Sequence, residues 1–266
     1  MINIAKRELF FNNDEKLIIE KNGFSYTIPC QWAISGDGDV DYRLDANQRA
    51  FSHGATVGGD RKVKSKTVDI DVIVKGTTKE EHDNIVNEVY RYFGQKDYRL
   101  FCGRQDRIYN VSGVQKIKQK YIKSFKQKMS DITLTLLLAD PFRYGIQKKV
   151  ITEDLYEAVT EKVIEVINDG NVEIPLIITL TPAISMPDVL IEHMESGYSC
   201  RVRDSLLTNP ASLVIDTKNG TVRRGYLNAI NTFNGQFLMA LPGMNLYKIT
   251  SDAGNISFSY HERWLL

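Results

Sequence analysis

Two stretches of the chain alternate apolar residues with other residues at a period of two. In residues 68–74, valine or isoleucine occupies every even position, and in residues 132–138 isoleucine and leucine do the same. Such alternation is typical of strands with one buried face. An Asn22-Gly23 pair within residues 18–28 predicts a hairpin, because both residues accept positive φ. Further strands are predicted at residues 98–102, 107–114 and 115–125, and Pro141 is expected to end the strand that begins at Ile132.

One segment has the helical period instead. Thr78 and Glu81 form a capping-box pattern, Gly94 supplies a stop, and apolar residues at 85, 86, 89, 92 and 93 lie between them. This pattern predicts a helix over about Lys79–Phe93. Residues 35–45 and 51–60 are polar and rich in glycine and aspartate, and we predict loops there.

Beyond Gly145 the pattern changes to many short strands separated by turn residues. They are predicted at residues 159–166, 174–180, 212–216, 220–224, 236–240, 246–250 and 255–262. Even spacing of short strands favours a β-sandwich. The chain is therefore predicted to be mainly β (α+β), with an N-terminal domain over residues 1–144 that holds one helix and an all-β domain over residues 145–266.

Composition narrows the function classes. Lys plus Arg number 34 and Asp plus Glu 33 among 266 residues, which excludes a strongly basic nucleic-acid binder and a disordered acidic chain. The three cysteines, Cys30, Cys102 and Cys200, are too scattered for a disulfide framework. No apolar stretch approaches the ~20 residues of a membrane span. Charges among the first eleven residues argue against a secretory signal.

Candidate chemistry is sparse. No nucleophile elbow, phosphate loop or zinc-protease motif is present, and residues 54–59 are glycine-rich but lack the Gly-Lys-Ser/Thr ending. The histidines, His53, His82, His193 and His261, have no metal-ligand spacing, and His82 is expected on the solvated side of the helix. We therefore predict no enzyme activity and no catalytic, cofactor or metal site.

Acidic pairs and Cys102 have simpler interpretations. Glu80-Glu81 suits a helix start, and Cys102 is expected to be a buried free thiol. Asp69 and Asp71 share a strand face and could flank a sugar or a metal. Their nearness to Lys62, Lys64 and Lys66 favours a mixed charged face instead.

Six lysines crowd one segment, with Lys116, Lys118 and Lys120 on one strand face. They could meet an acidic partner or nucleic acid, or simply protect an exposed strand edge from aggregation. The interleaved Tyr121 and Phe125 favour a contact between subunits. Lys116, Lys118, Lys120, Tyr121 and Phe125 are therefore our predicted assembly interface.

The order of several short motifs is familiar. Residues 132–145 end in Asp-Pro-Phe-Arg-Tyr-Gly and resemble a junction found in distal tail proteins (Dit) of long-tailed phages, the siphovirus-type tail component family. The stretch from Gly59-Asp-Arg61 through the alternating strand and the helix is similar to that family's N-terminal order. In the C-terminal half, residues 168–171 with Pro175, residues 214–222 and residues 241–245 resemble three further family turns. The resemblance covers nearly the whole chain.

This resemblance implies a structural virion protein, made in the host cytoplasm and located at the tail tip. It implies that residues 1–144 resemble tail-tube proteins and form a homo-hexameric ring, and that residues 145–266 form a galectin-like sandwich. The implied partners are a tail-tube protein, a tail-tip or tail-associated protein at the baseplate, and a receptor-binding protein. DNA would pass the ring without sequence-specific recognition, and no membrane is involved.

Two other functions stay open. The chain could be a carbohydrate-binding adhesion module for the host wall, although Trp32 and Trp264 are isolated and no sugar platform is evident. It could also be a hydrolase in an unfamiliar fold, although no convincing acidic pair is present.

Overall fold

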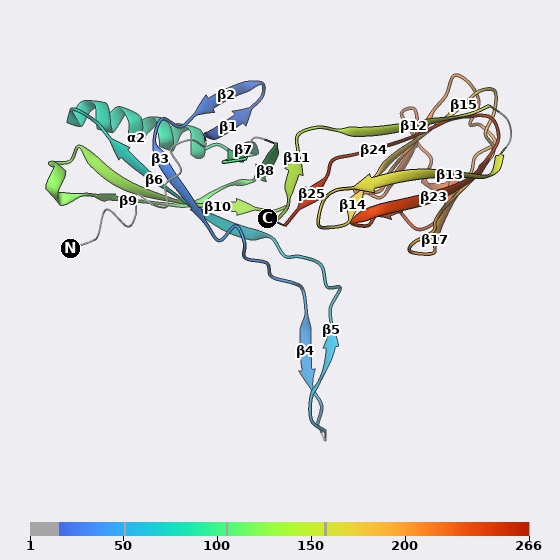
Figure 1. Ribbon diagram of the computed structural model, residues 1–266, viewed down its shortest axis with the longest axis horizontal. Coiled ribbons are helices and arrows are strands. Elements are labelled where there is room, and N and C mark those ends of the chain that lie inside the picture. Colours follow the sequence, from blue (N-terminus) through green and yellow to red (C-terminus); the bar gives the residue numbers. More distant parts are fainter. Residues whose placement is uncertain (1–15, 51, 105, 157–158, 266) are drawn as a thin grey trace. The chain divides into compact units, whose positions relative to one another are not determined.

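The computed structural model describes residues 16–50, 52–104, 106–156 and 159–265 (Figure 1). The chain is mainly β, as predicted, and the described residues form two compact units. The N-terminal unit runs to Tyr144 and includes Leu265, and the C-terminal unit spans Gly145–Trp264. Each unit has its own apolar core.

A four-stranded antiparallel sheet forms the base of the N-terminal unit. Its order is β3 (Gln31–Ser35), β6 (Lys66–Lys75), β10 (Met129–Leu138) and β9 (Gly113–Tyr121). The even-numbered apolar residues of β6 and β10 are buried on one face, as their alternation predicts. The opposite face carries the polar residues, and we call it the open face.

The helix α2 (Lys79–Phe93) has the predicted bounds, and the Thr78 hydroxyl accepts a hydrogen bond from the Glu81 amide at its start. It lies over the apolar face of the four-stranded sheet (Figure 1). A second sheet has the order β2 (Phe24–Thr27), β1 (Leu17–Lys21), β7 (Tyr98–Cys102) and β8 (Arg107–Val111). The predicted Asn22-Gly23 turn joins β1 to β2, with both residues at positive φ.

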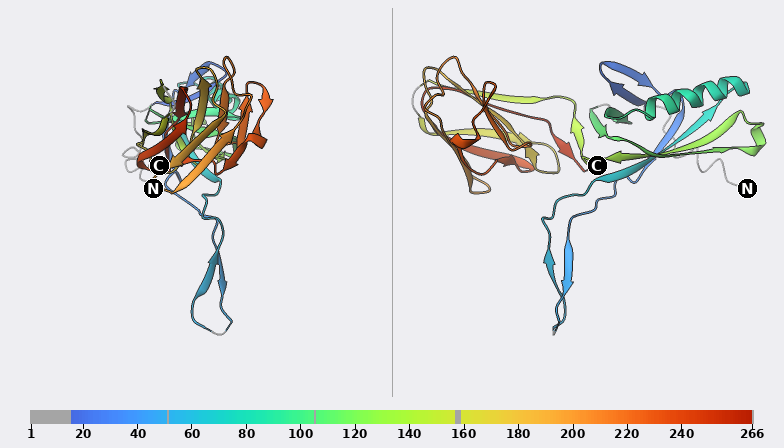
Figure 2. Two further views of the ribbon diagram at one scale, coloured as in Figure 1. Left: turned by 90° about the vertical axis from the view of Figure 1, so that its right-hand side faces the viewer. Right: turned by 180° about the vertical axis from the view of Figure 1, so that it is seen from behind.

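A long hairpin, which we call the arm (residues 41–64), extends away from the two sheets of its unit (Figure 2). Its strands β4 (Asp45–Gln48) and β5 (Ala55–Gly58) pair only with each other. The prediction of loops over residues 35–45 and 51–60 was therefore wrong for this ribbon, whose four-residue strands are too short and polar to give a periodic signal. Phe51 lies outside the described residues.

Three short elements complete the N-terminal half and the end of the chain. The 3₁₀ turn η1 (Lys123–Phe125) lies between β9 and β10. The strand β11 (Arg143–Gly145) contains the boundary between the units, and β25 (Arg263–Trp264) lies close to the C-terminus.

The C-terminal unit is a β-sandwich. One sheet has the order β12 (Lys149–Leu155), β24 (Gly254–Tyr260), β15 (Ile177–Pro182), β18 (Leu213–Asp216), β19 (Thr221–Arg224) and β20 (Leu227–Asn228). The other has the order β13 (Val159–Asn168), β23 (Gly243–Ser251), β16 (Asp188–His193), β17 (Tyr198–Arg203) and β21 (Phe233–Gly235). A small pair, β14 (Ile174–Pro175) with β22 (Met239–Ala240), and the turn η2 (Ile230–Thr232) complete the unit. Strands β12, β16, β17, β20 and β21 were not predicted.

Candidate assembly site

The predicted lysines lie on an edge strand. β9 pairs with β10 on one side, and no described residue pairs with it on the other. Lys116, Lys118 and Lys120, the lysine row, project from the open face and are exposed. None of the three makes an ion pair with a described residue.

The open face has a regular cross-strand order. Behind Lys116 lie Thr135 on β10, Asp69 on β6 and Ser35 on β3. The next row runs from Lys118 through Thr133 and Asp71 to Ala33, and a third from Lys120 through Asp131 and Ile73 to Gln31. On the open face, the lysines of the edge strand β9 are thus separated from the aspartates of the inner strand β6 by the threonines of β10. At the opposite edge, β3 places the short side chains of Ala33 and Ser35 next to those aspartates.

The two aspartates of β6 differ in their bonding. Asp71 accepts a hydrogen bond of 2.6 Å from the Thr133 hydroxyl. One carboxylate oxygen of Asp69, Oδ1, is buried and has no hydrogen-bond partner among the described residues. The expected mixed charged face exists, but Lys62 and Lys64 lie in the arm, so that expectation was wrong about which lysines complete it.

The predicted aromatic residues do not share a face with the lysine row. Tyr121 projects to the helix side, where its ring lies 5.6 Å from the His82 ring, and it keeps 42% exposure. Phe125 is in η1 at the hairpin tip and is 41% exposed. The structure thus brings together the three lysines and separates them from the two aromatic residues.

His82 contradicts our expectation of a solvated surface histidine. Its ring is fully buried, with Nε2 2.8 Å from the Ser130 hydroxyl and Nδ1 3.0 Å from the Asp83 carboxylate. Position 82 precedes Val86, Val89 and Phe93 at steps of four, three and four, which is the buried stripe of α2. We expected a solvated side chain because histidine is polar, whereas its position in the helix places it in the buried stripe.

The arm carries exposed apolar side chains. Tyr42 pairs with Val63 and Ala46 with Val57, and the backbone between these pairs turns, since the Leu44 amide donates to the Tyr42 carbonyl at 3.1 Å. Tyr42, Leu44 and Val57 are 45%, 49% and 56% exposed. A two-stranded ribbon is marginal by itself in water, so these side chains need a surface to cover them. Sequence reasoning missed this feature, because the segment has no uninterrupted apolar period.

A cluster of charged and aromatic side chains fixes the root of the arm. Arg143 Nη2 donates to Asp37 at 2.8 Å and stacks over the Tyr109 ring at 4.6 Å. Lys66 donates to the Asp37 carbonyl at 2.6 Å. Because Arg143 belongs to the Asp-Pro-Phe-Arg-Tyr-Gly motif, that motif serves to hold the base of the arm.

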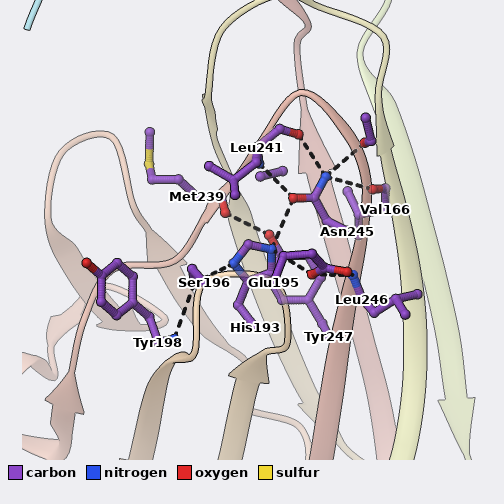
Figure 3. Close-up of polar contacts among 12 residues, drawn as sticks. Val166, His193, Glu195, Ser196, Tyr198, Met239, Leu241, Asn245, Leu246 and Tyr247 are labelled. Atoms are coloured by element: carbon purple, nitrogen blue, oxygen red, sulfur yellow. Dashed lines mark hydrogen bonds and ion pairs between the residues drawn. The ribbon is translucent and has the colours of Figure 1, made fainter.

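The remaining motifs build turns. Figure 3 shows the buried Asn245, whose side chain accepts from the Leu241 amide at 2.7 Å and donates to the Leu241 and Val166 carbonyls. His193 lies beside it, with Nε2 3.0 Å from Asn245 Oδ1 and Nδ1 2.7 Å from the Ser196 hydroxyl. Its ring stacks on Tyr247 at 4.7 Å. These groups pin two turns of the sandwich and leave the imidazole enclosed.

Two other turns use the same device. The Asn168 amide donates to Val172 and accepts from Gly170, and the Asp216 carboxylate accepts from Lys218 and Asn219. The motif residues therefore satisfy backbone groups at tight turns, as side-chain caps do elsewhere.

The other residues considered as candidates have structural roles in the N-terminal unit. Cys102 is buried on β7, and burial raises its pKa to about 12. Glu81 caps the helix start with Thr77. Trp32 lies in the N-terminal core.

No group of three or more His, Cys, Asp or Glu side chains suited to a metal occurs in the described part of the chain. No helix of that part is long and apolar enough to cross a membrane.

Comparison with known proteins agrees with the motif order. Residues 169–264 match the family model described as siphovirus-type tail component, C-terminal domain. The matched stretch lies within the C-terminal unit. This match confirms the resemblance to distal tail proteins, to which the motifs at residues 168–171, 214–222 and 241–245 contributed. No curated protein matches the chain.

A solved Dit structure has the same fold over both units. The crystal structure of SPP1 Dit (gp 19.1), described as a paradigm of the hub adsorption apparatus in phages infecting Gram-positive bacteria, superposes with a TM-score of 0.68 at 13% identity. The match covers 93% of this chain and 98% of SPP1 Dit.

Proposed function

We propose that this Dit-like chain is a structural hub of a phage tail and has no enzyme activity. Its N-terminal unit closes into a hexameric ring that joins the tail tube to the baseplate or tail tip, and its C-terminal unit docks the host-adsorption apparatus. The partners are then a tail-tube protein, a tail-tip protein and a receptor-binding protein, and DNA passes through the ring. The protein is made in the host cytoplasm and assembled into the virion.

The observation that carries the ring is the pair of unpaired edges on the four-stranded sheet. The described strands leave β3 open at one side and β9 at the other. Because the four strands alternate in direction, β9 runs opposite to β3. A second copy placed head to tail therefore sets its β3 antiparallel to the first copy's β9. Such a heterologous contact closes into a ring when the rotation allows it, and the resemblance supplies the number six.

The arm supports the same assembly. It emerges directly after β3, the strand whose edge is open, and its apolar side chains Tyr42, Leu44 and Val57 are uncovered in the single copy. In the ring, a neighbouring copy supplies the surface that covers them. Burial of these side chains adds apolar area to a contact that otherwise consists of strand hydrogen bonds.

One end of the sandwich supports docking of a further partner. Two loops meet there through the Ser185–Thr208 bridge, and the Arg224–Asp204 ion pair ties the next turn to them. The large apolar side chains on these loops are exposed: Ile184, Leu206, Tyr226 and Leu227. Four such residues on adjacent loops form an apolar surface that favours a protein partner.

The ring is tested on the full chain by native mass spectrometry together with negative-stain imaging. We expect six-copy rings, and we expect Tyr42→Ser with Leu44→Ser to raise the concentration at which rings form at least tenfold. The control, Tyr226→Ser with Leu227→Ser, changes the same residue types at more exposed positions of the C-terminal unit and leaves the ring unchanged. Monomers at all concentrations, or equal effects of the two pairs, would refute this assignment.

A further inference from the structure

The lysine row is a set of charges without partners in the single copy. Lys116, Lys118 and Lys120 are exposed and make no ion pair with a described residue. Within the copy, Thr135 and Thr133 stand between the first two lysines and the aspartates of β6. Three like charges on one strand face repel one another, so a nearby opposite charge would stabilise the edge.

At the opposite edge of the sheet, negative charges lie behind short side chains of the edge strand β3. On the open face of β3, the edge residues next to Asp71 and Asp69 are Ala33 and Ser35, which have short side chains. Neighbouring strands lie about 4.8 Å apart, so a lysine placed beyond β3 is about 10 Å from the β6 backbone. An extended lysine side chain of about 6 Å lies across alanine or serine and brings its ammonium group to the carboxylate.

The carboxylates also have capacity for another donor. Asp69 Oδ1 is buried without a partner among the described residues. Leaving a buried carboxylate oxygen unpaired is costly, and a charge-assisted hydrogen bond would remove that cost. In the single copy, the described residues supply no such donor.

We propose that Lys116 and Lys118 of one copy pair with Asp69 and Asp71 of the next copy in the ring, across Ser35 and Ala33 of that next copy. This inference rests on the proposed ring and adds to it the groups that set its register and its direction. Because the lysine row lies at the β9 edge and Asp69 and Asp71 lie behind the β3 edge, a contact of β9 with β9 would bring two lysine rows together and cause repulsion.

The test uses two charge-reversed versions of the full chain. Version A carries Lys116→Glu and Lys118→Glu, and version B carries Asp69→Lys and Asp71→Lys. Alone, each places like charges across every contact, and we expect ring formation to need at least tenfold more protein. In a mixture, the glutamates of A face the lysines of B, and the lysines of B face the aspartates of A. The mixture should therefore form rings that alternate, with three copies of each version, near the wild-type concentration.

Three controls make the outcome decisive. Lys123→Glu with Lys126→Glu, at the tip of the same hairpin, should leave assembly unchanged. Circular dichroism checks that each version is folded, and Lys118→Glu with Asp71→Lys is the milder pair if version B unfolds. Failure of folded A and B to rescue each other overturns the pairing between copies, while wild-type rings keep the proposed function. Absence of wild-type rings overturns both.

Discussion

Replacing Asn245 by alanine should weaken the C-terminal unit severely. The Asn245 amide is fully buried, and its two ends hold the turn at Leu241–Gly243, the Val166 carbonyl and the His193 ring (Figure 3). Alanine removes all of these hydrogen bonds and leaves the partner groups enclosed. It also removes one of the two oxygens near His193 Nε2 and leaves the Glu195 carboxylate at 3.1 Å.

The expected loss of stability follows from the buried polar groups that lose their hydrogen-bond partner. A buried polar group without a hydrogen bond costs about 1–3 kcal/mol. The Leu241 amide and the Val166 carbonyl are the groups most dependent on Asn245, because His193 keeps Glu195 and Ser196 as partners. Since such costs do not add fully, we expect a loss of about 3–4 kcal/mol, a large share of the roughly 5–15 kcal/mol that stabilises a typical domain.

Hydrogen exchange of the full chain measures this loss within the C-terminal unit itself. Amides of β16 and β23 should exchange at least about 100-fold faster in Asn245→Ala, since each 1.4 kcal/mol is about tenfold. The control is Asn255→Ala, which removes an exposed hydrogen bond to Asp154. It should change exchange less than about threefold, as surface substitutions do. Equal, small effects of the two substitutions would refute the role of Asn245 as the turn's central support.

Three other predictions concern the helix cap and the thiols. Thr78→Ala, measured by urea unfolding, should lower stability by about 1 kcal/mol because it removes the N-cap acceptor of the Glu81 amide, and no loss would contradict the cap. The hydrogen bond from the Thr77 hydroxyl lowers the pKa of Glu81. Wild type should therefore be more stable than Glu81→Gln above the usual Glu pKa of about 4.3. This difference should disappear as pH falls through the lower folded pKa, whereas a constant difference down to pH 3, about one unit below the usual value, would refute it. Burial raises the pKa of Cys102 and Cys200 to about 12 and that of Cys30 to about 11, so iodoacetamide near neutral pH should label all three far faster in urea than in the native chain. Rapid native labelling of Cys102 or Cys200 would contradict their burial.

The sequence pattern predicted those strands and that helix in which the regularly spaced apolar residues are also the buried ones. The strands at residues 68–74 and 132–138 and the helix at Lys79–Phe93 were predictable because each buries one face with an uninterrupted apolar period. His82 was misjudged because a polar residue occupies a position in the buried stripe, where Ser130 on another strand supplies its partner. Such a long-range partner leaves no local signal.

The arm and the assembly site depend on surfaces that a single chain does not complete. The ribbon β4–β5 buries nothing within its own unit, so burial did not select a strong pattern there. The lysine row was evident from composition, but its alignment with Asp69 and Asp71 depends on the register of four strands distant in sequence. The resemblance to Dit came from the junction at residues 132–145, the N-terminal order of elements and three C-terminal turns, whose side chains bond nearby backbone groups and so form short motifs.

The central claim is that copies of this chain join β9 to β3 in a closed ring. Imaging of the full-length protein at near-atomic resolution by electron cryomicroscopy tests it most directly. The account predicts six copies whose four-stranded sheets form one continuous antiparallel β-barrel, with each arm covered by a neighbour. A monomer at high concentration, or a ring joined through the C-terminal units with free β9 and β3 edges, would contradict it.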